Sequence, residues 1–75
     1  PLTERREDIP LLADKFLQDI AEEYGAVPKI IDDAAMQHLQ NLPWTGNVRE
    51  LRNVIERLVI MCGDTITLQD VELYA

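Results

Sequence analysis

The chain has one cysteine, no long apolar run and few basic residues. Cys62 alone cannot form an internal disulfide, which favours a reducing compartment. No apolar run approaches the roughly 20 residues that a membrane-spanning helix needs, and the first residues do not resemble a signal peptide. We therefore expect a cytoplasmic protein that makes no membrane contact.

Positive charge is scarce, because seven lysines and arginines face 14 aspartates and glutamates, for a net charge of −7. A protein that binds duplex DNA needs a basic face that displaces counterions from the phosphates. Residues 44–63 form the one net-positive segment, with three arginines against two glutamates. The composition argues against DNA binding and directs attention to this segment.

The length of 75 residues allows one small core and no second domain. The chain starts at Pro1 without an initiator methionine. We therefore expect a single domain excised from a longer protein.

Apolar periodicity predicts two helices in the first half of the chain. The first covers residues 9–24, with Asp8 as N-cap and Gly25 as its end. Residues 26–31 contain a proline and are expected to be extended, and residues 33–41 form a short second helix capped by an aspartate. The core-facing side chains of the first helix are expected to be Ile9, Leu12, Ala13, Phe16, Leu17, Ile20 and Tyr24.

Two capping signatures predict the remaining helices. Asn47 and Glu50 have the spacing of a capping box at the start of a third helix, and Gly63 supplies its stop. Thr67 and Asp70 repeat the pattern before a last short helix. The third helix carries one apolar stripe, made of Val48, Leu51, Ile55, Leu58, Val59 and Cys62. The fold class is therefore all-α, a small bundle of about four helices.

Arg49 stands in the first turn of the third helix, where the helix dipole disfavours a cation by about 0.3–1 kcal/mol unless an anion is near. Free backbone N–H groups and a guanidinium at one helix end suit a phosphate. Arg52 has Glu56 as a natural partner at i+4, which leaves Arg49 the least neutralised, and Val48 adds an apolar contact beside it. On spacing alone, a solvated arginine on the helix face is the simpler alternative.

The single tryptophan, histidine and cysteine are expected to have structural rather than chemical roles. Trp44 is expected to fill the junction between the second and third helices, because an indole buries a large area. His38 has no metal-ligand spacing to Cys62, whose apolar surroundings indicate a core residue. We predict no metal site and no catalytic residue in this chain.

Two motifs carry a family resemblance. Residues 4–12 have the sequence Glu-Arg-Arg-Glu-Asp-Ile-Pro-Leu-Leu, and residues 43–53 have Pro-Trp-Thr-Gly-Asn-Val-Arg-Glu-Leu-Arg-Asn. Together they make the chain resemble, over nearly its whole length, the C-terminal helical lid subdomain of the AAA+ ATPase module in sigma-54-dependent transcriptional activators, the NtrC-like enhancer-binding proteins. In that reading the whole chain is the lid, and residues 1–8 are the linker from a large α/β subdomain outside this chain.

The resemblance implies roles for individual residues. Arg49 matches the family's sensor II arginine, which reaches the γ-phosphate of ATP, and Val48 matches a position near the adenine. Ile9 is a weaker candidate for the adenine side. Thr3 stands where the family usually has arginine. The implied ligand is ATP, with its Mg²⁺ held by the large subdomain.

The chain has no glycine-rich phosphate loop with its lysine and no acidic pair for magnesium. It is therefore not expected to be an enzyme alone, whereas the implied parent is an AAA+ ATPase of a two-component system. The implied partners are the large subdomain, neighbouring protomers of a ring, sigma-54 RNA polymerase through a loop outside this chain, and DNA through a separate helix-turn-helix domain. The alternatives are a lid of another AAA+ subfamily, a free-standing helical interaction module and a helix-turn-helix-like DNA binder.

Overall fold

The computed structural model describes residues 4–44 and 46–75. Thr3, which stands where the family usually has arginine, and Thr45 lie outside these ranges. The described elements are, in chain order, the 3-10 turn η2 (Arg6–Asp8), α1 (Ile9–Tyr24), β1 (Ile30–Ile31), α2 (Asp33–Gln40), α3 (Val48–Met61), β2 (Thr65–Ile66) and α4 (Leu68–Tyr74). The predicted all-α bundle is confirmed, with four α-helices in the described ranges, and none of these helices is long and apolar enough to cross a membrane.

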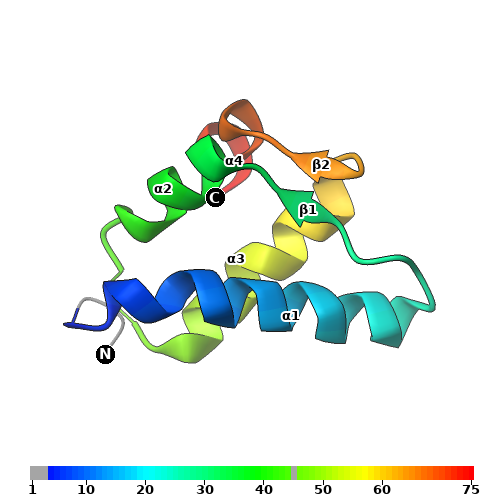
Figure 1. Cartoon of the computed structure of the whole chain (residues 1–75), viewed down its shortest axis with the longest axis horizontal. Helices are drawn as coiled ribbons and strands as arrows, with labels where there is room; N and C mark the ends of the chain where they lie inside the picture. Colours follow the sequence, from blue (N-terminus) through cyan, green and yellow to red (C-terminus); the bar gives the residue numbers. More distant parts are fainter. Residues whose placement is uncertain (1–3, 45) are drawn as a thin grey trace.

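The helices form two packed pairs. Helix α1 lies across α3, and α2 packs against α4 on the other side of the core (Figure 1). Figure 1 also shows that α1 and α3 begin at the same end of the molecule, the left end in that view. The start of α3, with its arginine, is therefore held beside the segment that leads into α1.

The core is apolar and draws on every helix. Its fully buried side chains of largest volume are Ile9, Ile20, Leu39, Leu51, Ile55, Leu58, Ile66 and Val71. The expected stripes hold for most positions, but Tyr24 is 55% exposed and Val48 44%. These two predictions of burial are wrong, because each residue stands at a helix terminus where the neighbouring helix no longer covers it.

A short parallel strand pair joins the two halves of the chain. Ile30 pairs with Thr65 and Ile31 with Ile66, so β1 lies beside β2. Periodicity predicted only an extended connection over residues 26–31, since two-residue strands have no period of their own. Because the strands are parallel, α2 and α4, which follow them, start at the same place and pack together (Figure 1).

Three of the predicted helix ends are confirmed. Gly25 ends α1 in the left-handed region at φ 64°, where a side chain would be strained. The Asp32 carboxylate accepts a hydrogen bond from the Ala35 N–H at 2.8 Å and caps α2. Thr67 and Asp70 form the complete capping box at the start of α4.

Three other helix ends differ from prediction. Asp8 makes no side-chain cap, because it is already helical within η2 and its carboxylate instead lies 3.8 Å from the Arg5 guanidinium. Gly63 is not left-handed, because α3 stops when Cys62 turns to an extended conformation. The Asn47 side chain does cap α3, but by accepting from the Arg49 N–H, and no capping box forms with Glu50 among the described residues.

Candidate functional site

The turn before α3 is anchored by an indole. Trp44 is 3% exposed, and its Nε1–H donates to the Leu39 carbonyl of α2 at 2.9 Å. Its backbone N–H donates to the Leu42 carbonyl at 2.8 Å. Trp44 therefore fills the junction of α2 and α3, as predicted, and fixes where the third helix starts.

Two backbone N–H groups in the first turn of α3 are occupied. The Arg49 N–H donates to Asn47 Oδ1 at 3.0 Å, and the Glu50 N–H donates to the Asn47 carbonyl at 3.0 Å. The Glu50 carboxylate turns back over Gly46, where an added Cβ would lie 2.0 Å from Oε2. The expectation of free backbone N–H groups is therefore wrong for Arg49 and Glu50, which leaves the Arg49 guanidinium as the main group that could meet an anion here.

Arg49 and Val48 are both exposed at the start of α3. No residue in the described ranges pairs with the Arg49 guanidinium, and the 44% exposure of Val48 leaves an apolar surface beside it. The structure thus brings together the cation and the apolar side chain that the sequence predicted as a nucleotide-facing pair.

Ile9 lies apart from this exposed pair. It is fully buried at the start of α1, in the same core cluster as Leu51 and Ile55. Its side chain supports the packing under the start of α3 and has no surface of its own to offer to a ligand. Only Val48 of the two predicted adenine-side residues is accessible in this structure.

Arg52 is neutralised by a neighbouring helix. Its Nη2 lies 2.7 Å from Glu23 Oε2 of α1, and its guanidinium carbon lies 5.9 Å from the Phe16 ring centroid. The hydrogen bond to Glu23 raises the pKa of Arg52 above its ordinary value. The i+4 pair predicted with Glu56 is replaced, because Glu56 accepts from the Tyr24 hydroxyl at 3.2 Å.

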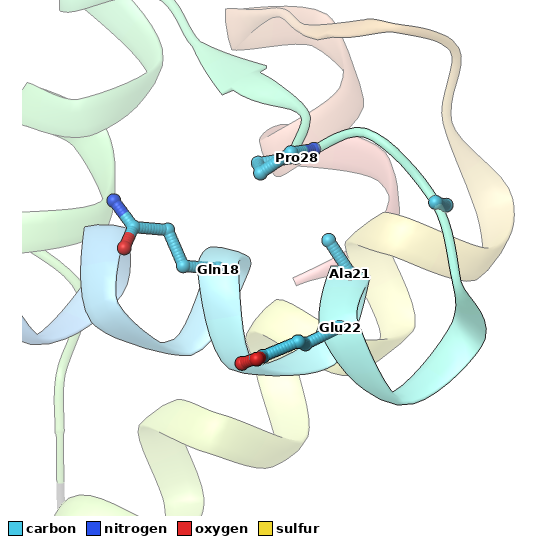
Figure 2. Close-up of a pocket in the computed structure, with 5 residues that line it drawn as sticks. Gln18, Ala21, Glu22 and Pro28 are labelled. Atoms are coloured by element: carbon cyan, nitrogen blue, oxygen red, sulfur yellow. The ribbon is translucent and has the colours of Figure 1, made fainter.

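Two shallow hollows lie along α1. One is lined by Asp19, Glu22, Glu23 and Arg52, so the ion pair forms part of its wall. The second, of about 400 Å³, lies between α1 and the connection to β1. Figure 2 shows Ala21 pointing toward Pro28 across this second hollow. Arg49 lines neither hollow.

The chain's histidine and cysteine show no chemistry of a reactive centre. No group of three or more His, Cys, Asp or Glu in the described ranges could hold a metal ion. Cys62 is half-buried at the end of α3, where burial and then the Asp70 carboxylate raise the pKa of its thiol. A thiol that holds its proton more tightly is a poorer nucleophile.

Two basic residues have structural roles that the sequence analysis missed. Arg6 donates from Nη1 to the Gln40 carbonyl and to the Leu42 carbonyl, the latter at 3.0 Å. Lys29 donates to the Val59 carbonyl at 2.6 Å and to the Cys62 carbonyl. Each cation sits at the negative end of a helix 30 or more residues away, and no local spacing reveals such a contact.

Comparison with known proteins places this helix bundle in a family. Residues 3–75 match the AAA+ ATPase lid domain. The chain is 47% identical over 66 residues to the alginate biosynthesis transcriptional regulatory protein AlgB of Pseudomonas aeruginosa, covering 88% of this chain and 15% of that protein. It is 47% identical over 73 residues to the transcriptional regulatory protein ZraR of Salmonella typhimurium, covering 96% of this chain and 17% of that protein.

The DNA-binding transcriptional regulator NtrC of Escherichia coli is 45% identical over 71 residues, which cover 93% of this chain and 15% of the regulator. The chain thus spans about one-sixth of the length of these relatives. The match over nearly all of its residues agrees with the fold and with the resemblance drawn from residues 4–12 and 43–53. The chain belongs to the AAA+ ATPase lid domain family.

Proposed function

We propose that this chain is the lid of the AAA+ module of a sigma-54-dependent transcriptional activator, and that Arg49 contacts the γ-phosphate of bound ATP. The observation that carries the proposal is the exposed guanidinium of Arg49, which has no partner in the described ranges, beside exposed Val48. The family match and the transcriptional regulators among the relatives support the setting.

Arg49 stands out when the three arginines of α3 are compared. Arg52 is paired with Glu23 at 2.7 Å, and Arg57 donates to the Tyr74 carbonyl at 3.3 Å. Arg49 has no such partner among the described residues, although its position in the first turn is the one that the helix dipole favours least for a cation. A phosphate anion from outside this chain would supply the missing partner.

We propose different roles for the large subdomain and for the lid. The large subdomain holds ATP and Mg²⁺ and cleaves the nucleotide, and the lid closes over it with Arg49 toward the γ-phosphate and Val48 toward the adenine. Because α3 is packed against α1 across the core, a displacement of Arg49 moves the whole bundle. In a ring of protomers in the cytoplasm, that movement couples nucleotide state to remodelling of sigma-54 RNA polymerase.

The test uses the full-length protein with Arg49→Ala, and Arg57→Ala as matched control on the same helix. We expect Arg49→Ala to lower ATP turnover at least tenfold, because about 1.4 kcal/mol or more of charge-assisted hydrogen bonding to the phosphate is lost. Sigma-54-dependent transcription should fall in parallel. Arg57→Ala should stay within twofold of wild type in both assays.

Unchanged turnover and unchanged transcription in Arg49→Ala would remove this residue from the site. A loss of equal size in Arg57→Ala would contradict the proposal as well, since it would show a general effect of weakening α3. Circular dichroism of each variant checks that the lid remains folded.

A further inference from the structure

The turn before α1 is fastened to the end of α2 by reciprocal hydrogen bonds. Arg6 Nη1 donates to the carbonyls of Gln40 and Leu42, the second at 3.0 Å. The Gln40 side chain donates back from Nε2 to the Arg6 carbonyl at 3.1 Å. We call this set of contacts between Arg6, Gln40 and Leu42 the η2–α2 clamp.

The η2–α2 clamp places a positive charge at the negative end of α2, and its hydrogen bonds are partly protected from water. The last carbonyls of α2 lack partners within the helix and form its negative end, so a guanidinium is the matching group. Both hydrogen bonds of the Arg6 guanidinium are part-buried, which reduces their screening by salt. The adjacent Arg5 differs, since its side chain is 72% exposed and lies 3.8 Å from Asp8 on its own turn.

The clamp leads on to the start of α3. The Leu42 carbonyl that Arg6 holds also accepts the Trp44 N–H at 2.8 Å, and the Trp44 indole is bonded to Leu39. Trp44 precedes α3, which begins at Val48 and carries Arg49 in its first turn. A contiguous set of hydrogen bonds therefore connects η2 with the junction that positions Arg49.

Without the clamp, η2 would have little to hold it. It is three residues long and contains no buried residue, and its own backbone bonds run from the Asp8 N–H to the Arg5 carbonyl at 2.9 Å and from the Ile9 N–H to the Arg6 carbonyl. Single turns of this kind fray readily. A rotation imposed from the N-terminal side would then be absorbed in η2 instead of reaching α3.

We propose that Arg6 is a positioning residue that makes η2 part of the lid's rigid body, so that the lid rotates about a point N-terminal to Arg6 and Arg49 follows that rotation in full. The proposal rests on the function proposed for Arg49, because it states how movement reaches that arginine. It assigns Arg6 no contact with nucleotide.

The first measurement is amide hydrogen exchange in the full-length protein, followed in peptides that cover residues 4–8 and 40–44. Arg6→Ala removes the guanidinium bonds, Gln40→Ala removes only the return bond, and Arg5→Ala is the matched control. We expect exchange at least tenfold faster in both segments for Arg6→Ala and a smaller increase for Gln40→Ala, with Arg5→Ala like wild type. Exchange unchanged in Arg6→Ala would refute the clamp.

The second measurement separates positioning from stability. At a temperature where circular dichroism shows each variant folded, Arg6→Ala should lower kcat for ATP at least fivefold and change KM less than twofold, with Gln40→Ala between it and wild type. An unchanged kcat despite faster exchange would refute the coupling to Arg49. Suppose that Arg49→Ala left ATP turnover unchanged while Arg6→Ala still accelerated amide exchange. The γ-phosphate role of Arg49 would then be refuted, and the η2–α2 clamp would remain as a structural contact only.

Discussion

Replacement of Trp44 by alanine should remove a large share of the lid's stability. The indole is 3% exposed and occupies the junction between α2 and α3. Truncation of a buried tryptophan to alanine costs about 3–5 kcal/mol, whereas a 75-residue domain has roughly 4–11 kcal/mol in total. We expect the urea midpoint of the isolated chain, measured by far-UV circular dichroism, to fall by at least about a quarter, and the chain to unfold without urea if its stability lies at the low end of that range.

Trp44→Phe is the matched control because it keeps most of the aromatic area and removes the indole N–H. The Leu39 carbonyl that loses this donor still accepts from the Leu42 N–H at 3.3 Å. The expected cost is therefore nearer to 1 kcal/mol plus the smaller lost contact area. A loss below about 1 kcal/mol in Trp44→Ala would refute the argument that the indole fills the junction.

Gly46→Ala should destabilise the lid, because the new Cβ would lie 2.0 Å from Glu50 Oε2, which can move aside, and 3.2 Å from Glu50 Cβ, which the helix backbone holds in place. Gly63→Ala meets nothing within 4 Å and should stabilise the lid by about 0.4–1 kcal/mol, because alanine lowers the entropy of the unfolded chain. Urea denaturation of both variants tests this order, and a destabilised Gly63→Ala would contradict it. The raised pKa of Cys62 predicts that iodoacetamide reacts more slowly with the folded chain than with the urea-unfolded chain at pH 8. Equal alkylation rates in the folded and unfolded chain would contradict the raised pKa. Because the pKa of the thiol is higher in the folded chain, its contribution to stability is present below the unfolded pKa and is lost as pH rises through the folded pKa.

The helices were predictable because their signals are local. Apolar periodicity and Gly25 predicted the bounds of α1, although the cap expected at Asp8 does not form, and α2 followed from the cap at Asp32. The strand pair was not predictable, since Ile30 and Thr65 are held by a partner 35 residues away and not by a pattern of their own. Local signals determine which residues are helical, and tertiary contacts determine how the helix ends are completed.

In the candidate site, too, the residues marked by local signals were predicted and those that depend on tertiary contacts were not. Arg49 and Val48 were identified from their place after a helix cap, and both are exposed as that place requires. The pairing of Arg52 could not be found from spacing, because Glu23 on α1 replaces the i+4 partner only after α1 and α3 pack. Arg6 was missed for the same reason, because its acceptors at the end of α2 exist only in the folded chain.

The long-range contacts of α3 distinguish Arg49 from the other two arginines of this helix. When the sequence is considered alone, any arginine on the polar face of α3 could be solvated or could bind an anion. Folding gives Arg52 a carboxylate and Arg57 a helix-terminal carbonyl, while Arg49 is left without a partner among the described residues. The proposed anion contact is therefore assigned to Arg49 rather than to Arg52 or Arg57.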